Sequence, residues 1–174
     1  MSLTGRSGSQ PLPKVPTQVR VFAAPADVAH SSVAVSDDEL LSVDSPVTVT
    51  LHCRDSFDNP TDTLAAASIR HQGSAEASST RKVECVDGVG RVSLRSPLSG
   101  KHSVSVLVQA ADDQMAEVHN SPATVSLKPG SLDIGSTTWV DAGEPVVAAP
   151  KHEVLFQAAD SLGNAVAAPD LQIG

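Results

Sequence analysis

The sequence predicts an all-β protein in which short antiparallel strands form a sandwich of two sheets. Apolar and polar residues alternate in short segments, and each segment is followed by turn residues, which is typical of strands that bury one face. No stretch keeps a helical period. Aromatic residues are scarce, with one Trp, three Phe and no Tyr, so we expect a core built mainly from Val, Leu and Ala.

The first three strands follow a flexible polar leader at residues 1–16. Residues 19–21 begin the first strand. Residues 47–53 form the second, because Val, Leu and Cys alternate there with Thr and His. Asp, Asn and Pro at 55–60 predict a turn, and residues 66–71 form a weaker third strand.

Four further strands complete the predicted sandwich. They are residues 83–85, 92–94, 102–108 and 125–127. An Asp-Gly turn at 87–88 joins the first two of these. His102 shares one face of its strand with three Val residues, so we interpret it as a core residue. Pro122 fits only the start or the edge of the last strand.

One motif occurs twice in the chain. Residues 49–59 align without a gap with residues 154–164, at an offset of 105 residues. At the same offset, Ser31, Val35 and Glu39 fall opposite Ser136, Val140 and Glu144. A unit the size of a sandwich therefore repeats, and the second copy holds only its opening strands. We predict a flexible leader at 1–16, a complete repeat at 17–128 and an incomplete second repeat at 129–174, in a piece of a longer array.

Seven short strands with turns at this spacing indicate an immunoglobulin-like sandwich, and the residues resemble the filamin-type immunoglobulin-like repeat. The resemblance rests on the turn motif at 55–59, on Val-Asp-Gly at 86–88, on Val-Ser-Leu at 92–94, and on residues 100–106 and 120–127. It covers residues 17–128 well and the second copy partially. The chain departs from the family where aromatic residues are usual, at Gly90, Leu94, His102 and Ala123.

The resemblance implies a non-enzymatic structural or scaffold module, which binds partner peptides by β-strand addition or acts as a spacer. In the family, the peptide site is the groove between the third and fourth strands. The corresponding candidate residues here are Ser68, Ile69, Arg70, His71, Arg81, Lys82 and Val83. Ile69 is expected to line the groove, and the cations suit an acidic or phosphorylated peptide in a protein of net charge -8. The alternative is that the cations protect an exposed strand edge against aggregation.

We interpret Cys53 and Cys85 as two buried free thiols. The expected topology places the fifth strand between their strands, which separates them by about 9 to 10 Å at about 4.8 Å per strand. A disulfide needs Cα atoms within about 7 Å. Free thiols agree with a reducing compartment, so we expect a cytoplasmic or cytoskeletal location, with the cell surface as the alternative if a signal peptide has been lost.

No catalytic residues, metal ion or cofactor are expected. Asp55 and Asn59, with their copies Asp160 and Asn164, are interpreted as structural turns, because calcium-loop spacing is absent. The six His residues show no pair at metal-ligand spacing. Neither a nucleophile elbow nor a phosphate loop occurs, so the chain is not expected to be an enzyme.

The expected partners are proteins, either an extended peptide or a cytoskeletal protein, and neighbouring repeats. The negative charge disfavours nucleic acid, and no segment approaches the roughly 20 apolar residues of a membrane span. Two settings stay open: an actin-associated cytoskeletal protein, and adhesion at a cell surface, for example that of a gamete, where filamin-type repeats also occur.

The second copy raises a further hypothesis. Its opening strands leave Val140, Val154 and Phe156 without core partners. The segment at 129–174 either packs on the first repeat or is completed by another chain. When the chain is alone, we expect weak protection of this segment in hydrogen exchange.

Overall fold

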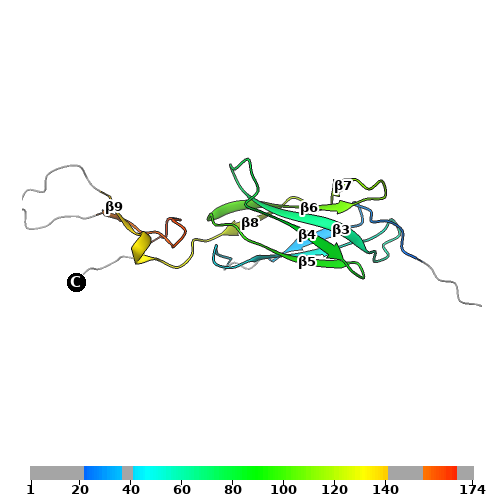
Figure 1. Cartoon of the computed structure of the whole chain (residues 1–174), viewed down its shortest axis with the longest axis horizontal. Coiled ribbons are helices and arrows are strands. Elements are labelled where there is room, and N and C mark those ends of the chain that lie inside the picture. Colours follow the sequence, from blue (N-terminus) through cyan, green and yellow to red (C-terminus); the bar gives the residue numbers. More distant parts are fainter. Residues whose placement is uncertain (1–21, 37–40, 141–154, 168–174) are drawn as a thin grey trace, which may run out of the picture.

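Two antiparallel sheets face each other in the computed structural model, which describes residues 22–36, 41–140 and 155–167 (Figure 1). The first sheet has the order β1-β2-β5, with β1 at Ser32–Val35, β2 at Val47–His52 and β5 at Val89–Leu94. The second has the order β4-β3-β6, with β4 at Ser79–Cys85, β3 at Thr63–His71 and β6 at Gly100–Gln109. The predicted all-β sandwich is confirmed.

Two further strands pair with the remaining edge of β6. Strand β7 (Met115–Glu117) pairs with one end of β6 and β8 (Ala123–Leu127) with the other. Strand β7 was not predicted from the sequence, because three residues are too few to show an alternation of apolar and polar side chains. The first strand expected at 19–21 lies outside the described residues, and β1 forms where the sequence alternates less regularly.

The core lies between the sheets and is aliphatic. Alternate residues of β2, β3 and β6 point into it and are at most 3% exposed: Val47, Val49, Leu51, Ala65, Ala67, Ile69, Val104, Val106 and Val108. None of the described buried residues is Phe, Tyr or Trp, so the expected composition of the core is confirmed. His102 is buried in the same interior, as predicted.

A tight hairpin carries the chain from one sheet to the other. Val86 and Val89 exchange both backbone hydrogen bonds at 3.1 Å, and the two residues between them, Asp87 and Gly88, have φ of 51° and 76°. Asp-Gly is favoured in such two-residue turns because both positions need positive φ. The hairpin therefore leaves β4 at the edge of one sheet and β5 at the edge of the other.

The second copy forms a two-stranded sheet at one end of the sandwich (Figure 1). Its strands are β9 (Thr138–Val140) and β10 (Leu155–Gln157), after a short 3-10 turn at Ile134–Ser136. Val140 pairs with Leu155, as Ala34 pairs with Thr50 in the first copy.

This pairing corrects the alignment of the two copies. Val140 corresponds to Ala34, at an offset of 106 residues, whereas Leu155 corresponds to Thr50 at the offset of 105. The predicted match of Ser31 and Val35 with Ser136 and Val140 is therefore wrong by one residue. The sequence motif fixes the register only downstream, because the first strand of each copy is short and irregular.

Candidate functional site

The two strands predicted to border a peptide groove, β3 and β4, are hydrogen-bonded to each other. Strand β3 pairs with β4 continuously, from Thr63 opposite Cys85 to Ile69 opposite Ser79, and its other side pairs with β6. Both edges of β3 are therefore occupied. Ile69 is 0% exposed and belongs to the core, so the expectation that it lines the groove is wrong. Peptide binding at this site stays a prediction.

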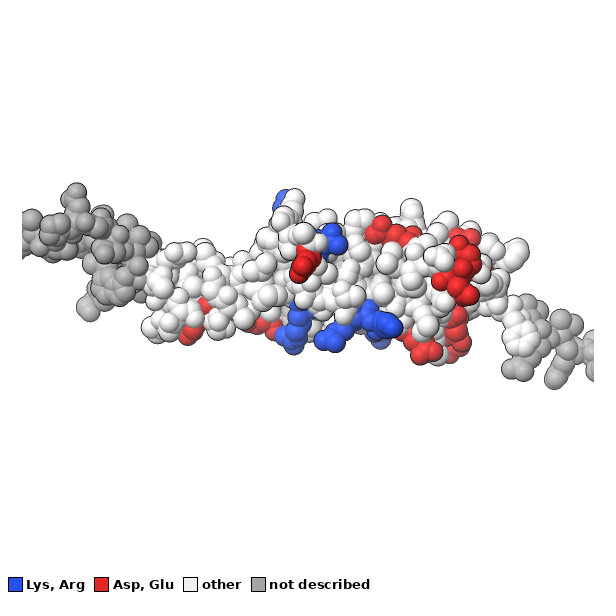
Figure 2. Space-filling model, turned by 45° about the horizontal axis from the view of Figure 1, so that its top comes forward, with Lys and Arg blue, Asp and Glu red and all other residues white. Residues whose placement is uncertain are grey.

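The other predicted groove residues divide into buried and exposed groups. Val83 packs into the core, Ser68 is half-buried opposite Thr80, and His71 lies 3.1 Å through Nε2 from the Ser99 carbonyl oxygen. The exposed ones are the cations Arg70, Arg81 and Lys82. Lys and Arg side chains gather along the flank of the sandwich (Figure 2). The open strand edge with these cations beside it is the outer edge of β4.

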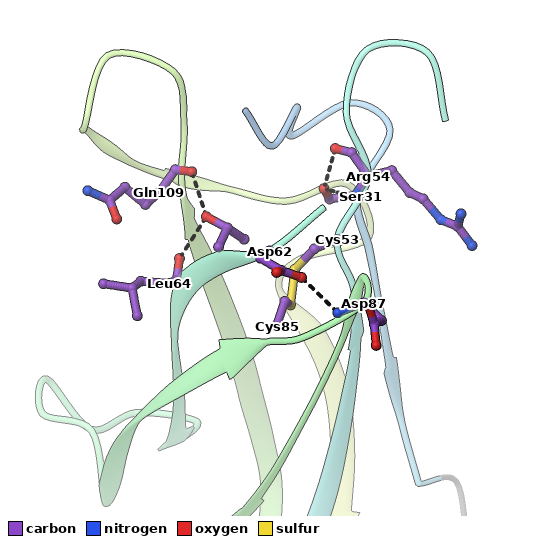
Figure 3. The surroundings of a disulfide bond; sticks show 9 residues. Ser31, Cys53, Arg54, Asp62, Leu64, Cys85, Asp87 and Gln109 are labelled. Atoms are coloured by element: carbon purple, nitrogen blue, oxygen red, sulfur yellow. Dashed lines mark hydrogen bonds between the residues drawn. A yellow bond between two sulfur atoms is a disulfide. The ribbon is translucent and has the colours of Figure 1, made fainter. Parts of the chain in front are cut away.

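Cys53 and Cys85 form a disulfide, which corrects the prediction of two free thiols (Figure 3). Their Cα atoms are 6.4 Å apart and both residues are 0% exposed. The prediction failed because it counted strands within one sheet. Strand β4 pairs with β3 in the opposite sheet, so the two cysteines face each other across the sandwich.

A close approach of the two sheets accompanies this bond. A Cβ atom on Gly90 of β5 would lie 3.0 Å from Val83 Cγ2 and 3.1 Å from Cys85 Sγ. A side chain there would press into the disulfide and its neighbour. The absence of a side chain at Gly90 therefore leaves room for the disulfide and Val83.

Short polar contacts tie the loops around the disulfide (Figure 3). The Asp87 N–H donates to Asp62 Oδ1 at 2.7 Å, and Thr63 Oγ1 donates to the Gln109 carbonyl at 3.0 Å. Ser31, which is buried, accepts from the Arg54 N–H and donates to the Arg54 carbonyl. This end of the molecule is therefore fixed by one covalent bond and several hydrogen bonds.

Asp55 organises a turn beside the disulfide end. Its carboxylate accepts the N–H groups of Ala24, Phe57 and Asn59, together with the Asn59 side-chain amide. Burial raises the pKa of Asp55, but these hydrogen bonds, that of the Asn59 side chain first, outweigh it and lower the pKa to about 2. The turn therefore rests on an ionised carboxylate.

The second copy builds the same turn from the same residue types. Asp160 accepts the N–H groups of Gly130, Leu162 and Asn164, and the Asn164 side-chain amide. Burial raises the pKa of Asp160, and the hydrogen bonds of Asn164, Gly130 and Leu162 again lower it to about 2. Three backbone N–H donors and one side-chain amide thus recur at both places, which gives the repeated motif a structural counterpart.

The two turns differ in their surroundings. Asn164 lies against the first sandwich, where its Oδ1 accepts the Ser99 N–H at 2.8 Å and its Nδ2 donates to the Pro97 carbonyl at 2.9 Å. Nearby, the Ser131 N–H donates to Asp44 Oδ2 at 3.2 Å. Of the two alternatives for the second copy, the structure places its turn on the first sandwich.

Two histidines support the loop that Asn164 contacts. His102 Nδ1 lies 3.0 Å from the Gly100 carbonyl and Nε2 lies 2.8 Å from Ser96 Oγ. Burial lowers the pKa of His102, and the nearby His71 adds to this against the opposing effect of the Gly100 carbonyl. A neutral ring that donates from Nδ1 accepts the Ser96 hydroxyl at Nε2.

The Ser96 and His102 pair has the composition of a catalytic dyad but not the access. Both residues are 1% exposed, and a nucleophile has to reach its substrate. The pair instead anchors the loop at 96–100. Among the described residues, no group of three His, Cys, Asp or Glu side chains is placed to hold a metal ion.

Within the same described ranges, no helix has the length and apolar character needed to cross a bilayer.

Comparisons with known proteins give one kind of match. No family model matches the sequence, and no curated protein matches it. Among solved structures, the chain is similar to the crystal structure of the Lin-41 filamin domain, with 16% sequence identity and a TM-score of 0.41. The match covers 62% of this chain and 100% of that chain.

Proposed function

We propose that this chain is a non-enzymatic structural module that acts through protein contacts, binding an extended peptide on the outer edge of β4 or spacing its neighbours. The observation that supports it is the position of β4. It pairs on one side only, and Arg81 and Lys82 are exposed on it. An open edge offers backbone hydrogen bonds to an added strand, and flanking side chains select its sequence.

The charge of the flank defines the peptide that we expect. The chain carries a net charge of -8, yet β3 and β4 present Arg70, Arg81 and Lys82 as exposed cations. An acidic or phosphorylated extended peptide complements this flank. The competing role of these cations is to keep the β4 edge from pairing with other chains.

Binding of designed peptides distinguishes the two roles. Peptides of alternating Glu and Val, or of alternating phosphoserine and Val, are titrated by fluorescence anisotropy, with Lys and Val peptides as the charge control. The double variant Arg81→Glu and Lys82→Glu should weaken binding about tenfold through two lost ion pairs and new repulsion. Arg91→Glu, on the edge of the other sheet, is the matched control and should leave binding nearly unchanged.

Two results would refute peptide binding at β4. One is that neither acidic peptide binds, and the other is that Arg91→Glu weakens binding as much as the double variant does. The module would then be a spacer whose cations protect the edge.

The disulfide supports a second candidate function, adhesion at a cell surface. Disulfides persist in oxidising compartments and are rare in the cytosol, and Cys53 and Cys85 are bonded here. This favours a surface setting over the actin-associated one. Alkylation of the protein from its own cells without reductant, followed by mass spectrometry, tests it: unmodified cysteines are expected, and two alkylated cysteines would restore the cytoplasmic setting.

A further inference from the structure

The chain carries one docked and one exposed copy of the same turn. In the docked copy, Asn164 accepts from the Ser99 N–H and donates to the Pro97 carbonyl. The side-chain amide therefore recognises a donor and an acceptor two residues apart on one loop. Asn164 is 9% exposed in this contact.

The exposed copy holds its amide in the same way. Asn59 Nδ2 donates to Asp55 Oδ2 at 3.1 Å, as Asn164 Nδ2 donates to Asp160 Oδ2 at 2.9 Å. Within the described part of the chain, Asn59 is exposed and its side chain bonds only to Asp55. The side-chain oxygen Oδ1 of Asn59 and the second hydrogen on its Nδ2 are available to a partner.

The two ends of the sandwich differ in charge. Acidic side chains gather at the end away from β9 (Figure 2), where Asp58, Asp62, Asp112 and Asp113 are exposed. The loop end carries the exposed cations Arg95, Lys101 and Lys128 beside the carboxylate of Asp44. Phe57, which is 79% exposed, adds apolar surface beside Asn59.

We infer that the turn at 55–59 is a docking surface for the 97–99 loop of a second copy of this sandwich. The contact would repeat the one that Asn164 makes, and it would bring the acidic end of one copy close to Arg95, Lys101 and Lys128 of the other. In a single chain the loop is already occupied by its own Asn164. Docking between chains is therefore masked until Asn164 leaves the loop. This inference goes beyond the proposed peptide site and does not involve β4.

Nuclear magnetic resonance of the full chain tests the masking. The ¹⁵N-labelled wild-type chain is titrated with unlabelled Asn164→Ala chain up to about 1 mM, the affinity range of a contact with few hydrogen bonds. Concentration-dependent shifts are expected at Phe57 and at the Asn59 side-chain amide. Unlabelled wild-type chain should produce no such shifts, and a labelled Asn59→Ala chain should show none with either partner.

A second variant is needed in case Asn164→Ala alone leaves the 97–99 loop covered by the second copy. Asp160→Ala combined with Asn164→Ala removes the whole turn, and faster exchange of the Ser99 amide reports that the loop is open. Absence of shifts with both unlabelled variants, once the Ser99 amide exchanges faster, overturns the inference. Equal shifts with wild-type and variant partners overturn it as well, because they show that Asn164 masks nothing.

Discussion

Single carboxylates determine the geometry of both turns. Asp55 and Asp160 each gather three backbone N–H groups and one side-chain amide. These donors favour the ionised carboxylate, which is why the pKa of each is lowered to about 2. Each carboxylate also positions the Asn four residues later, so an Asp in this place controls what the Asn amide can contact.

The lowered pKa values predict a loss of stability in acid. The unfolded carboxyl has a pKa of 3.8 and the folded one about 2, so the stabilisation is present above pH 3.8 and is lost as the pH falls towards 2. Urea unfolding between pH 5 and pH 2 measures it. The double variant Asp55→Asn and Asp160→Asn should show a smaller dependence on pH in this window.

The same double variant distinguishes the effect of the two carboxylates from that of His102. Burial lowers the pKa of His102, and the variant leaves this residue unchanged. Carboxyl titrations by ¹³C resonance should give values near 2 for Asp55 and Asp160. Values near 3.8 would contradict the role assigned to the turns.

At the scale of elements, one loop receives contacts from two directions. His71 and His102 hold residues 96–100 from within the sandwich, and Asn164 bonds the same loop from the second copy. The position of the second copy therefore depends on a loop whose shape the first sandwich determines.

A pair of matched substitutions isolates this contact. Asn164→Ala should speed hydrogen exchange of the Ser99 amide about fivefold, because a hydrogen bond contributes about 1 kcal/mol and the variant removes the acceptor of the Ser99 N–H. Asn59→Ala removes the same kind of side chain from the other turn. Because the Asn59 side chain makes no hydrogen bond to the loop at 96–100, the Ser99 amide should exchange as in the wild type. Equal exchange of the Ser99 amide in all three chains would show that the second copy does not contact the loop in solution. That result would agree with the weak protection of residues 129–174 that the sequence predicts.

At the scale of the whole molecule, the disulfide joins the two sheets. It connects the end of β2 in one sheet with the end of β4 in the other, next to the crossing hairpin. Because the core lacks aromatic residues among its described members, this covalent link between the sheets has a large share in holding them together.

Reduction is expected to destabilise the sandwich substantially. The cysteines are 32 residues apart, and closure of a loop of this size contributes about 3 to 4 kcal/mol through the unfolded state. Guanidinium unfolding with and without dithiothreitol measures the loss. A Cys53→Ala and Cys85→Ala variant should be insensitive to dithiothreitol, and an insensitive wild type with two titratable thiols would exclude the bond.

Sequence analysis succeeded where a feature depends on neighbours along the chain. The alternation in β2 and β6 predicted which side chains enter the core, and His102 was placed there with them. The Asp-Gly pair predicted the hairpin at 87–88. Strand β1 was not recognised because four residues with a weak alternation form a strand only through pairing with β2.

The sequence by itself determined the all-β class, the composition of the core and the repeated turn motif, because these follow from local periodicity and turn chemistry. Only the tertiary structure decided that Cys53 meets Cys85, that Ile69 is buried and that Asn164 docks where Asn59 stays exposed. Each of these depends on which strand joins which sheet and on which segments meet across the fold. Two turns built on the same Asp and Asn thus make different contacts, because each turn lies beside different segments of the fold.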